Sequence, residues 1–349
     1  MVTRNDVAKR AGVSPAVVSY VMNNSNYVSD EKRAAVLTAA TELGYYPNSL
    51  ARNLKLGHSN QILLITDDIR NELFSEVAFY MEAVAYQKGY SFSISSSSQK
   101  EYDKLLDSLN SRQYAGVMIF SSTFPLQEEH IKKLNHLCIT GCNIVLFMFS
   151  QTKYEIRPEI SLIRTSIRES VSKAVDYLFE KGHMRIGYLG DGDPIAGGES
   201  GPFGDGLRIN GYLDSLRSHN VVPRKEHIFF LDEFKYPSLE FMNIEGVVDA
   251  YFSLPEEDRP TAFFVNSDFL AAKLITRFRH HGIETPAQME IIGFGNTSSA
   301  SISYPNLTTV DVPCRSIGEC AIHILLDKIA GNDVKTTFFD MQLIKGGSA

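Results

Sequence analysis

Residues 6–15 read Asp-Val-Ala-Lys-Arg-Ala-Gly-Val-Ser-Pro, and this stretch decides the fold at the start of the chain. The apolar spacing before Gly12 predicts a short helix, and Gly12 can adopt the left-handed conformation that ends one. Ser14 then stands at an N-cap position, and Pro15 follows where the first helical residue has no need of an N–H donor. The stretch therefore predicts two short helices joined by a glycine turn.

The second predicted helix has a packing side and an exposed side. Val18, Val21 and Met22 share one side, at spacings of three and four residues, and are expected to pack inside the domain. The other side is expected to face DNA and carries Pro15, Ala16, Ser19, Tyr20 and Asn23.

A third helix is predicted after Ser29, which stands at the cap position before two acidic residues. Its apolar residues run from Val36 to Leu43, and Gly44 ends it. Three short helices with one glycine turn form the smallest helix-turn-helix DNA-binding unit. A helix bundle without DNA binding could carry the same caps, so this pattern alone leaves both interpretations open.

Charge is divided unevenly along the 349 residues. Residues 1–60 hold seven basic and four acidic residues, a net charge of +3, and the rest holds 27 basic and 37 acidic residues, a net charge of −10. A basic end on an acidic body attracts DNA at that end. The chain has no apolar run of membrane-spanning length and no apolar export signal at its start, so we expect a cytoplasmic protein.

Beyond residue 60, short apolar runs alternate with helical patterns, and the rhythm restarts near residue 169. This alternation predicts buried parallel strands with crossover helices, in two doubly wound lobes. Sheets of this type bind ligands at the carboxyl ends of their strands, here in a cleft between the lobes. Strands are expected at 62–65, 91–94, 116–120, 186–189, 228–230, 262–265 and 291–294, and helices at about 72–88, 101–112 and 169–181.

The sequence offers no constellation for catalysis. Cys138 and Cys142 have the spacing of metal ligands, but a second Cys or His pair at usable spacing is missing, so we expect buried thiols. The glycine-rich run at 190–206 lacks the spacing of a phosphate-binding loop and is expected at the edge of the cleft. We therefore expect no enzyme activity, no metal and no cofactor.

Two long motifs, at residues 6–14 and 42–54, resemble the signature of the LacI/GalR family of bacterial transcription regulators. The resemblance covers essentially the whole chain, because 181–187, 260–263 and 307–310 match later landmarks of the family. It implies an N-terminal all-α helix-turn-helix head with a hinge helix, joined to an α/β body like the periplasmic binding proteins, with two doubly wound parallel-sheet lobes.

The resemblance also implies where the domains begin and end, with crossings between the lobes near 162, 293 and 325. The expected parts are the head at 1–46, the hinge at 47–60, an N-terminal lobe at 61–162 plus 294–325, and a C-terminal lobe at 163–293 plus 326–349.

For DNA, the family implies that the hinge becomes helical on the operator and that Leu54 from each subunit of a dimer enters the minor groove as a wedge. Pro15, Ala16 and Tyr20 occupy the main base-reading positions. Family members often carry arginine in place of Tyr20, so the preferred half-site should differ. Further residues expected at the DNA are Ser14, Ser19, Asn23, Ser29, Asn48, Ala51 and Lys55.

For a ligand, Arg208 stands where the family places a clamping arginine, whose fork binds vicinal hydroxyls or a carboxylate. The implied effector is a sugar or sugar derivative. However, Gly295 and Phe149 stand where sugar-responsive relatives usually have carboxylates. Phe74 could instead be a core residue, and Asp268 could instead cap the helix that follows it. The remaining ligand candidates are Asp67, Asn71, Phe74, Ser267, Asp268 and Asn296.

These patterns lead to one main hypothesis: a repressor that binds a palindromic operator as a homodimer, with an affinity controlled by a small molecule in the cleft. A second hypothesis makes the body a platform for protein interaction, with a protein corepressor or no small ligand. A stand-alone solute-binding protein does not fit a chain that starts with a DNA-binding head and lacks an export signal.

Overall fold

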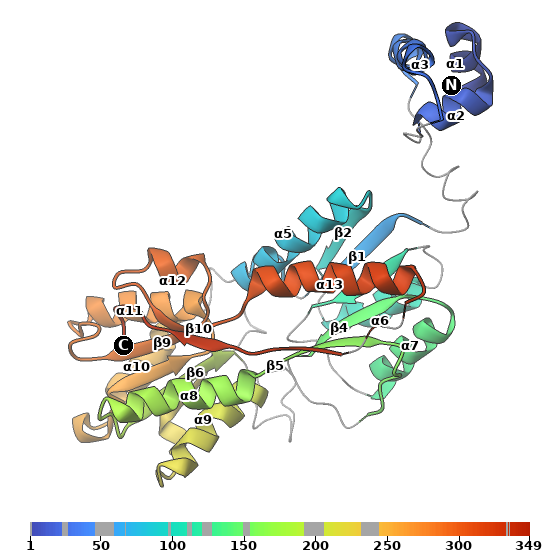
Figure 1. Ribbon diagram of the computed structural model, residues 1–349. Coiled ribbons are helices and arrows are strands. Elements are labelled where there is room, and N and C mark those ends of the chain that lie inside the picture. The colour runs from blue at the N-terminus through green and yellow to red at the C-terminus, as the bar shows by residue number, and fades with distance from the viewer. Residues whose placement is uncertain are drawn as a thin grey trace. The chain divides into compact units, whose positions relative to one another are not determined.

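The chain forms two compact units, residues 1–59 and 60–349. The second unit contains two lobes, each built on its own sheet (Figure 1). The computed structural model describes residues 2–22, 27–45, 59–66, 68–96, 99–109, 114–120, 128–148, 154–191, 206–231, 244–332, 334 and 336–349.

The first unit is the predicted head of three helices, α1 (Arg4–Ala11), α2 (Pro15–Met22) and α3 (Asp30–Leu43). One fully buried valine from each helix, Val7, Val18 and Val36, meets the others in a small core. Gly12 and Gly44 end α1 and α3 in the left-handed conformation, with φ of 67° and 61°. The apolar spacing and the two glycines thus place the helices as the sequence predicts.

The N-terminal lobe is a six-stranded parallel sheet in the order β11-β5-β4-β3-β1-β2. Helices α5 and α13 cover one face of the sheet and α6 and α7 cover the other, so the central strands β1, β3 and β4 are apolar on both faces. The strands are β1 (Gln61–Thr66), β2 (Ser91–Ser96), β3 (Gly116–Ile119), β4 (Ile144–Met148), β5 (Ser161–Thr165) and β11 (Thr337–Phe339), and the helices are α5 (Glu72–Gln87), α6 (Gln99–Leu109), α7 (Glu128–Ile139) and α13 (Cys314–Ile329).

The C-terminal lobe is a second six-stranded sheet in the order β12-β10-β9-β8-β6-β7. All of its neighbouring strands run parallel except β12, which is antiparallel to β10. Helices α8 and α9 pack on one face, and α10 and α11 on the other. The strands are β6 (Ile186–Asp191), β7 (Ile228–Leu231), β8 (Ala262–Val265), β9 (Glu290–Gly295), β10 (Thr308–Asp311) and β12 (Gln342–Ile344), and the helices are α8 (Ile167–Glu180), α9 (Gly206–Ser218), α10 (Ile244–Ser253), α11 (Asp268–His280) and α12 (Ser298–Ile302).

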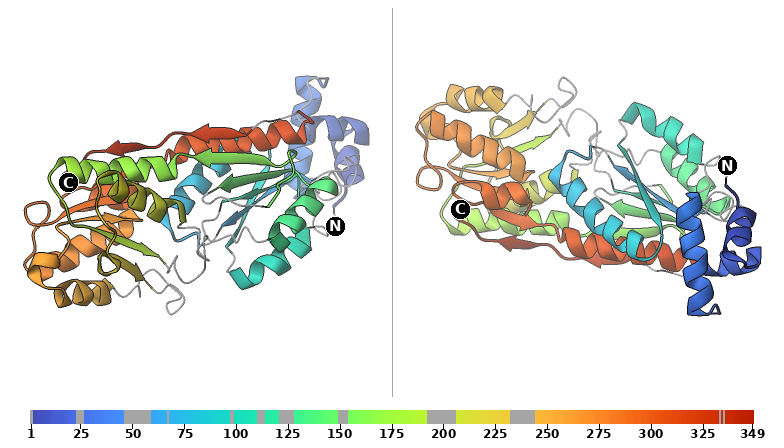
Figure 2. Two further views of the ribbon diagram at one scale, coloured as in Figure 1. Left: turned by 90° about the horizontal axis from the view of Figure 1, so that it is seen from below. Right: turned by 90° about the horizontal axis from the view of Figure 1, so that it is seen from above.

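The chain crosses between the two sheets three times: between β5 and α8, between β10 and α13, and between β11 and β12 (Figures 1 and 2). These crossings fall at residue 166, at 312–313 and at 340–341, whereas the sequence places them near 162, 293 and 325. The second differs because β10 follows β9 in the same sheet. The third differs because α13 continues to Ile329 over the N-terminal lobe before β11 joins that sheet.

The predicted hinge at 47–60 lies almost entirely outside the described residues. Within the described ranges, no helix has the length and apolar character needed to cross a membrane.

Candidate functional sites

The exposed side of α2 is the candidate DNA surface. Ser14, Pro15 and Ala16 are exposed, and the Tyr20 side chain is 51% exposed although it is aromatic. The Ser14 hydroxyl lies 3.4 Å from the backbone N–H of Val17 and accepts a hydrogen bond from it, as an N-cap does. The head therefore exposes small and polar side chains at the start of α2 and an aromatic one, Tyr20, further along the same helix, which can approach a DNA groove.

Two further predicted DNA residues are described. Ser19 is half-buried on α2, and Ser29 is exposed directly before α3. The side opposite the candidate surface is closed by Val18 and Val21, which are 0% and 4% exposed. Six predicted site residues lie outside the described residues: Asn23, Asn48, Ala51, Leu54, Lys55 and Asp67, and so does Phe149.

The body holds the candidate ligand site, and its best-defined part surrounds Arg208 in the first turn of α9. Arg208 Nη1 donates a hydrogen bond of 2.7 Å to the backbone carbonyl of Asn266, directly after β8. The guanidinium carbon lies 5.1 Å from the ring centre of Phe294 in β9, a cation–π distance. A helix start and the carboxyl ends of two strands thus hold Arg208 at the edge of the sheet where doubly wound folds bind ligands.

Asn266 is a further candidate site residue, which no sequence pattern singled out. Its side chain is 1% exposed, and neither its amide nitrogen nor its amide oxygen has a hydrogen-bond partner among the described residues. An unsatisfied buried amide is costly unless a water or ligand pairs with it. The position directly after an apolar strand, next to two residues already singled out, was the signal that could have found it.

Ser267 and Asp268 follow Asn266, but their side chains are engaged within the protein. The Ser267 hydroxyl caps α11 by accepting from Leu270 N–H at 3.3 Å. The Asp268 carboxylate is 1% exposed and accepts from the Thr297 N–H at 2.8 Å and from the Thr309 hydroxyl at 2.5 Å. Burial raises the pKa of Asp268, although these hydrogen bonds act against the rise. Asp268 therefore fastens the loop after β9 to β10.

The same carboxylate explains the glycines around Phe294. A Cβ atom added at Gly293 would lie 2.2 Å from Asp268 Oδ1, and one at Gly295 would lie 3.2 Å from Oδ2. Gly295 also has a φ of +128°, which side chains rarely allow. Sugar-responsive relatives usually have a carboxylate at the position of Gly295. Here the carboxylate of Asp268 occupies the space next to Gly295.

In the N-terminal lobe, the contacts of Asn71 and Phe74 are local. Asn71 caps α5, its side-chain oxygen accepting from Leu73 N–H at 3.0 Å. Phe74 is 3% exposed and packs edge-on against Phe120, with ring centres 5.4 Å apart. Their roles at a ligand stay predictions.

Asn296 is exposed after β9, with φ of +54°, and its amide donates to Asp311 Oδ1 at 2.8 Å. It lines a groove of about 440 Å³ between the lobes, whose walls are the first turns of α5 and the segment around α12. The structure thus brings Arg208, Ser267 and Asp268 together around Asn266, and places Asn296 in this separate groove.

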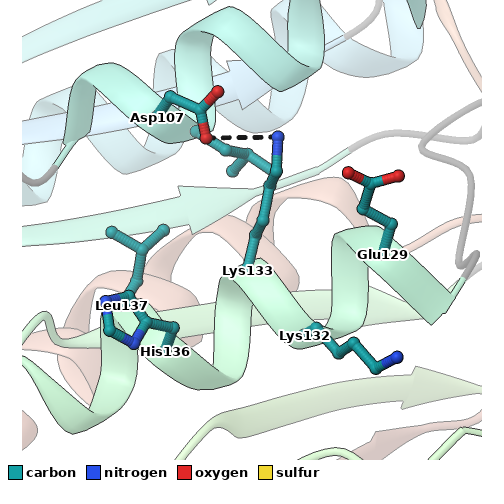
Figure 3. Close-up of a pocket in the computed structure, with 7 residues that line it drawn as sticks. Asp107, Glu129, Lys132, Lys133, His136 and Leu137 are labelled. Atoms are coloured by element: carbon teal, nitrogen blue, oxygen red, sulfur yellow. Dashed lines mark ion pairs between the residues drawn. The ribbon is translucent and has the colours of Figure 1, made fainter.

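A second hollow, of about 260 Å³, lies between α6 and α7 on one face of the N-terminal sheet. Figure 3 shows Lys133 pointing toward Asp107, at 3.1 Å, and the lysine also pairs with Asp103 at 2.8 Å. Lys132 pairs with Glu128. The lysines of this hollow are thus paired with neighbouring carboxylates. The hollow also lies between two helices and not at strand ends, so it carries no functional assignment.

Comparisons with known proteins agree with both units. Residues 3–48 match the model of the bacterial regulatory proteins of the lacI family, and residues 175–349 match that of the periplasmic binding protein-like domain. The chain is 31% identical over 352 residues to the HTH-type transcriptional repressor CytR of Escherichia coli K12, covering 99% of this chain and 96% of that protein. It is 31% identical over 338 residues to the repressor PurR of Edwardsiella ictaluri, with 94% and 91% covered.

Among solved structures, the fold is similar to that of the Lac repressor dimer bound to operator and the anti-inducer ONPF. The TM-score is 0.79 at 23% identity, covering 99% of this chain and 98% of that one. The named relatives are transcriptional repressors and not enzymes. With its helix-turn-helix head, its two-lobed body and this similarity over nearly its whole length, the chain belongs to the lacI family of bacterial regulatory proteins, the DNA-binding regulators of transcription.

Proposed function

We propose that the protein is a repressor that binds palindromic operator DNA and that a small molecule between its lobes controls this binding. The observation that carries the proposal is the exposed side of α2, where Ser14, Pro15, Ala16 and Tyr20 lie together on a head with a net positive charge. Basic charge supplies the attraction to phosphates, and exposed side chains on such a helix read the bases. A regulator of chromosomal DNA acts in the bacterial cytoplasm, where we place this one.

The proposed operator is palindromic because we propose a homodimer, whose twofold symmetry produces two equivalent half-sites. Exposed large apolar side chains on the body support dimerisation: Phe79 is 65% exposed on α5 in the groove that α12 also lines, and Ile302 is 78% exposed at the end of α12. Tyr86 and Tyr304 are also exposed, at 81% and 83%. Apolar residues grouped in this way commonly form protein contacts.

For the ligand, we propose a sugar or sugar derivative held by Arg208 and Asn266. The guanidinium group supplies donors in a fixed fork, and the buried Asn266 amide can supply one donor and one acceptor, which matches the dual character of a hydroxyl group. Arg208 and Asn266 can thereby offer a ligand several directed hydrogen bonds at the carboxyl end of β8.

Operator binding is tested by selecting bound sequences from random DNA with the full-length protein. We expect a palindrome with two half-sites. The Leu54→Ala variant should bind that sequence at least about tenfold more weakly and bind random DNA almost unchanged, because a wedge contributes where the DNA is kinked. An equal loss on both DNAs would contradict the proposed wedge.

Ligand binding is tested by a thermal-shift screen with sugars, sugar phosphates, nucleosides and amino acids. A bound ligand stabilises the native state by mass action, so a hit raises the melting temperature. The Arg208→Ala variant should lose the shift. Arg217→Ala is the matched control, because Arg217 lies on the same helix but pairs with Asp214 at 3.0 Å. A screen without hits would favour the alternative in which the body binds a protein corepressor.

A further inference from the structure

Glu72, the first residue of α5, reaches from the N-terminal lobe to the C-terminal lobe. One carboxylate oxygen accepts from the Ser299 hydroxyl at 2.8 Å, and the other accepts from the Ser299 backbone N–H at 3.1 Å. The two residues are 227 positions apart in the sequence. Burial alone would raise the pKa of Glu72, but hydrogen bonds from Thr297 and Ser299 outweigh it and hold the pKa below its usual value. The carboxylate is therefore charged at neutral pH and uses both oxygens across the lobe boundary.

The C-terminal partner of this contact is itself held firmly. Two residues before Ser299, the backbone and hydroxyl of Thr297 donate to the buried carboxylate of Asp268, at 2.8 and 3.2 Å. Asp268 in turn accepts from Thr309 in β10. Hydrogen bonds thus tie the loop after β9 to the C-terminal sheet at Thr297, and the backbone connects Thr297 to Ser299, which binds the start of α5. A displacement of α5 relative to that sheet must stretch the hydrogen bonds that Glu72 accepts from this segment, including the two from Ser299.

The groove of about 440 Å³ beside this contact gives the Glu72 side chain room to leave Ser299. Glu76 lies one turn further along α5 in the same groove, where burial and the charges of Asp311 and Glu72 raise its pKa. Two neighbouring carboxylates repel each other when both are charged. Hydrogen-bond donors that stabilise the charge on one of them, as Ser299 does for Glu72, are therefore favourable here.

Hydrogen bonds also join two of the segments in which the chain crosses between the lobes. The Ser166 hydroxyl donates to Asp340 Oδ1 at 2.6 Å and accepts from Met341 N–H at 2.9 Å, joining the first crossing to the third. Hydrogen exchange at these crossings reports whether the lobes move, because their amides open when the connecting segments bend.

We propose that Glu72 and Ser299 form a latch that holds the two lobes in the arrangement of this structure and must release when the lobes move. The inference rests on the proposed function, in which lobe movement transmits ligand binding to the head. It adds the residue pair that sets the balance between the two lobe arrangements. The latch favours one state through contacts that the other state lacks, which is the requirement for any such switch.

A simpler role would be local, since Glu72 also places negative charge at the start of the short helix α12. A cap of this kind protects the amides at 298–303 but has no effect on the crossings. A latch protects both. Amide exchange followed by mass spectrometry on the full-length protein, without DNA or ligand, separates the two roles.

The variants are Glu72→Ala, Ser299→Ala and, as matched control, Ser301→Ala, which lines the same groove but donates to Ser298 in its own helix at 2.9 Å. For Glu72→Ala we expect exchange about tenfold faster at 298–303, from the loss of two charge-assisted hydrogen bonds. We also expect exchange at least about threefold faster at 165–167 and 339–342, where the crossings lie. Ser299→Ala should show smaller changes at the same places, and Ser301→Ala none.

Faster exchange at 298–303 with unchanged crossings would overturn the latch and leave a helix cap. Unchanged exchange at both places would overturn it as well. If Glu72→Ala does not fold, Ser299→Ala decides, because it removes the hydroxyl contact while the backbone contact remains. A failure of the latch leaves operator and ligand binding untouched, since neither DNA nor ligand enters this experiment.

Discussion

The head and the body of this regulator use polar side chains in opposite ways. The head exposes them: Ser14 and Tyr20 project from a small helical domain whose interior is a cluster of valines. The body buries them: Asn266, directly after β8, and Asp268, the first residue of α11, are each 1% exposed. Exposed groups suit a large, charged partner that arrives from outside, whereas the buried Asn266 amide, which lacks a hydrogen-bond partner among the described residues, suits a small molecule.

The charges follow the same division, with a net charge of +3 over residues 1–60 and −10 over the rest. A negative body repels DNA and so confines binding to the head. The proposed DNA surface and the proposed ligand site thus have separate physical bases. Variants that damage one unit should therefore leave the other intact.

The largest effect is expected in the body, from Gly211→Ala on α9. A Cβ atom there would lie 2.4 Å from the Arg168 carbonyl oxygen and 2.9 Å from Val171 Cβ, so α8 and α9 must separate. We expect the body to lose about 3 kcal/mol of unfolding free energy, while the head keeps its stability. Calorimetry on the full-length protein measures both transitions.

Gly206→Ala, at the start of the same helix, is the control, because a Cβ atom there meets nothing within 4 Å. Equal destabilisation by both substitutions would show that close packing of α8 against α9 is not the cause.

The next effect is in the head, from Val18→Ala. Val18 is 0% exposed in a core of few residues, so the cavity should cost about 2 kcal/mol, a large share of the stability of so small a unit. DNA binding should weaken on every sequence, while a ligand-induced thermal shift of the body is unchanged. Val17→Ala, at a half-buried position, should cost less. A body transition that moves with Val18→Ala would break the separation of the two units.

A smaller effect is expected from Tyr20→Phe on the surface of α2. It removes one hydroxyl and keeps the ring, so operator binding should weaken about fivefold through a lost hydrogen bond. Binding to random DNA, which depends on phosphate contacts, should not change. Titrations of both DNAs at one salt concentration provide the comparison. An equal affinity of the variant and the original protein for the operator would remove the Tyr20 hydroxyl from base reading.

The smallest effect concerns pH and the Glu72 carboxylate. Its folded pKa lies below the usual value of 4.5, so its contribution to stability is complete above about pH 4.5 and disappears as the pH falls through the folded pKa. Because Glu72 is half-exposed, we expect less than about 1 kcal/mol. The difference in melting temperature between the protein and Glu72→Gln should be constant from pH 6 to 7, to within the precision of about a degree, and shrink in acid. A difference that grows in acid would contradict the assigned direction.

Local features of this fold are predictable from the sequence, and non-local ones are less so. Gly12 and Pro15 fix the first two helices because caps act within a few residues, and the apolar run at 262–265 coincides with β8. The crossings that the resemblance implies near 293 and 325 lie instead at 312–313 and 340–341, because the order of the strands in the two sheets sets where the chain crosses. Pairing of β10 with β9, and of β11 with β5, decides that.

The ligand site divides in the same way. Arg208 follows from its motif, and the structure places it against Asn266 and Phe294. The engagement of Asp268 does not follow, because Thr297 and Thr309 lie 29 and 41 residues away in the sequence. From the sequence alone, an aspartate after a buried strand can be a ligand residue or a structural one, and its hydrogen-bond partners decide between the two.

In the proposed function, a molecule bound in the body changes the affinity of the head for DNA. The direct measurement is the dissociation constant for the selected operator, with and without a compound that shifts the melting temperature, for the protein and for Arg208→Ala. We expect a change of at least about fivefold for the protein and none for the variant. A compound that stabilises the body through Arg208 but leaves operator affinity unchanged would contradict it.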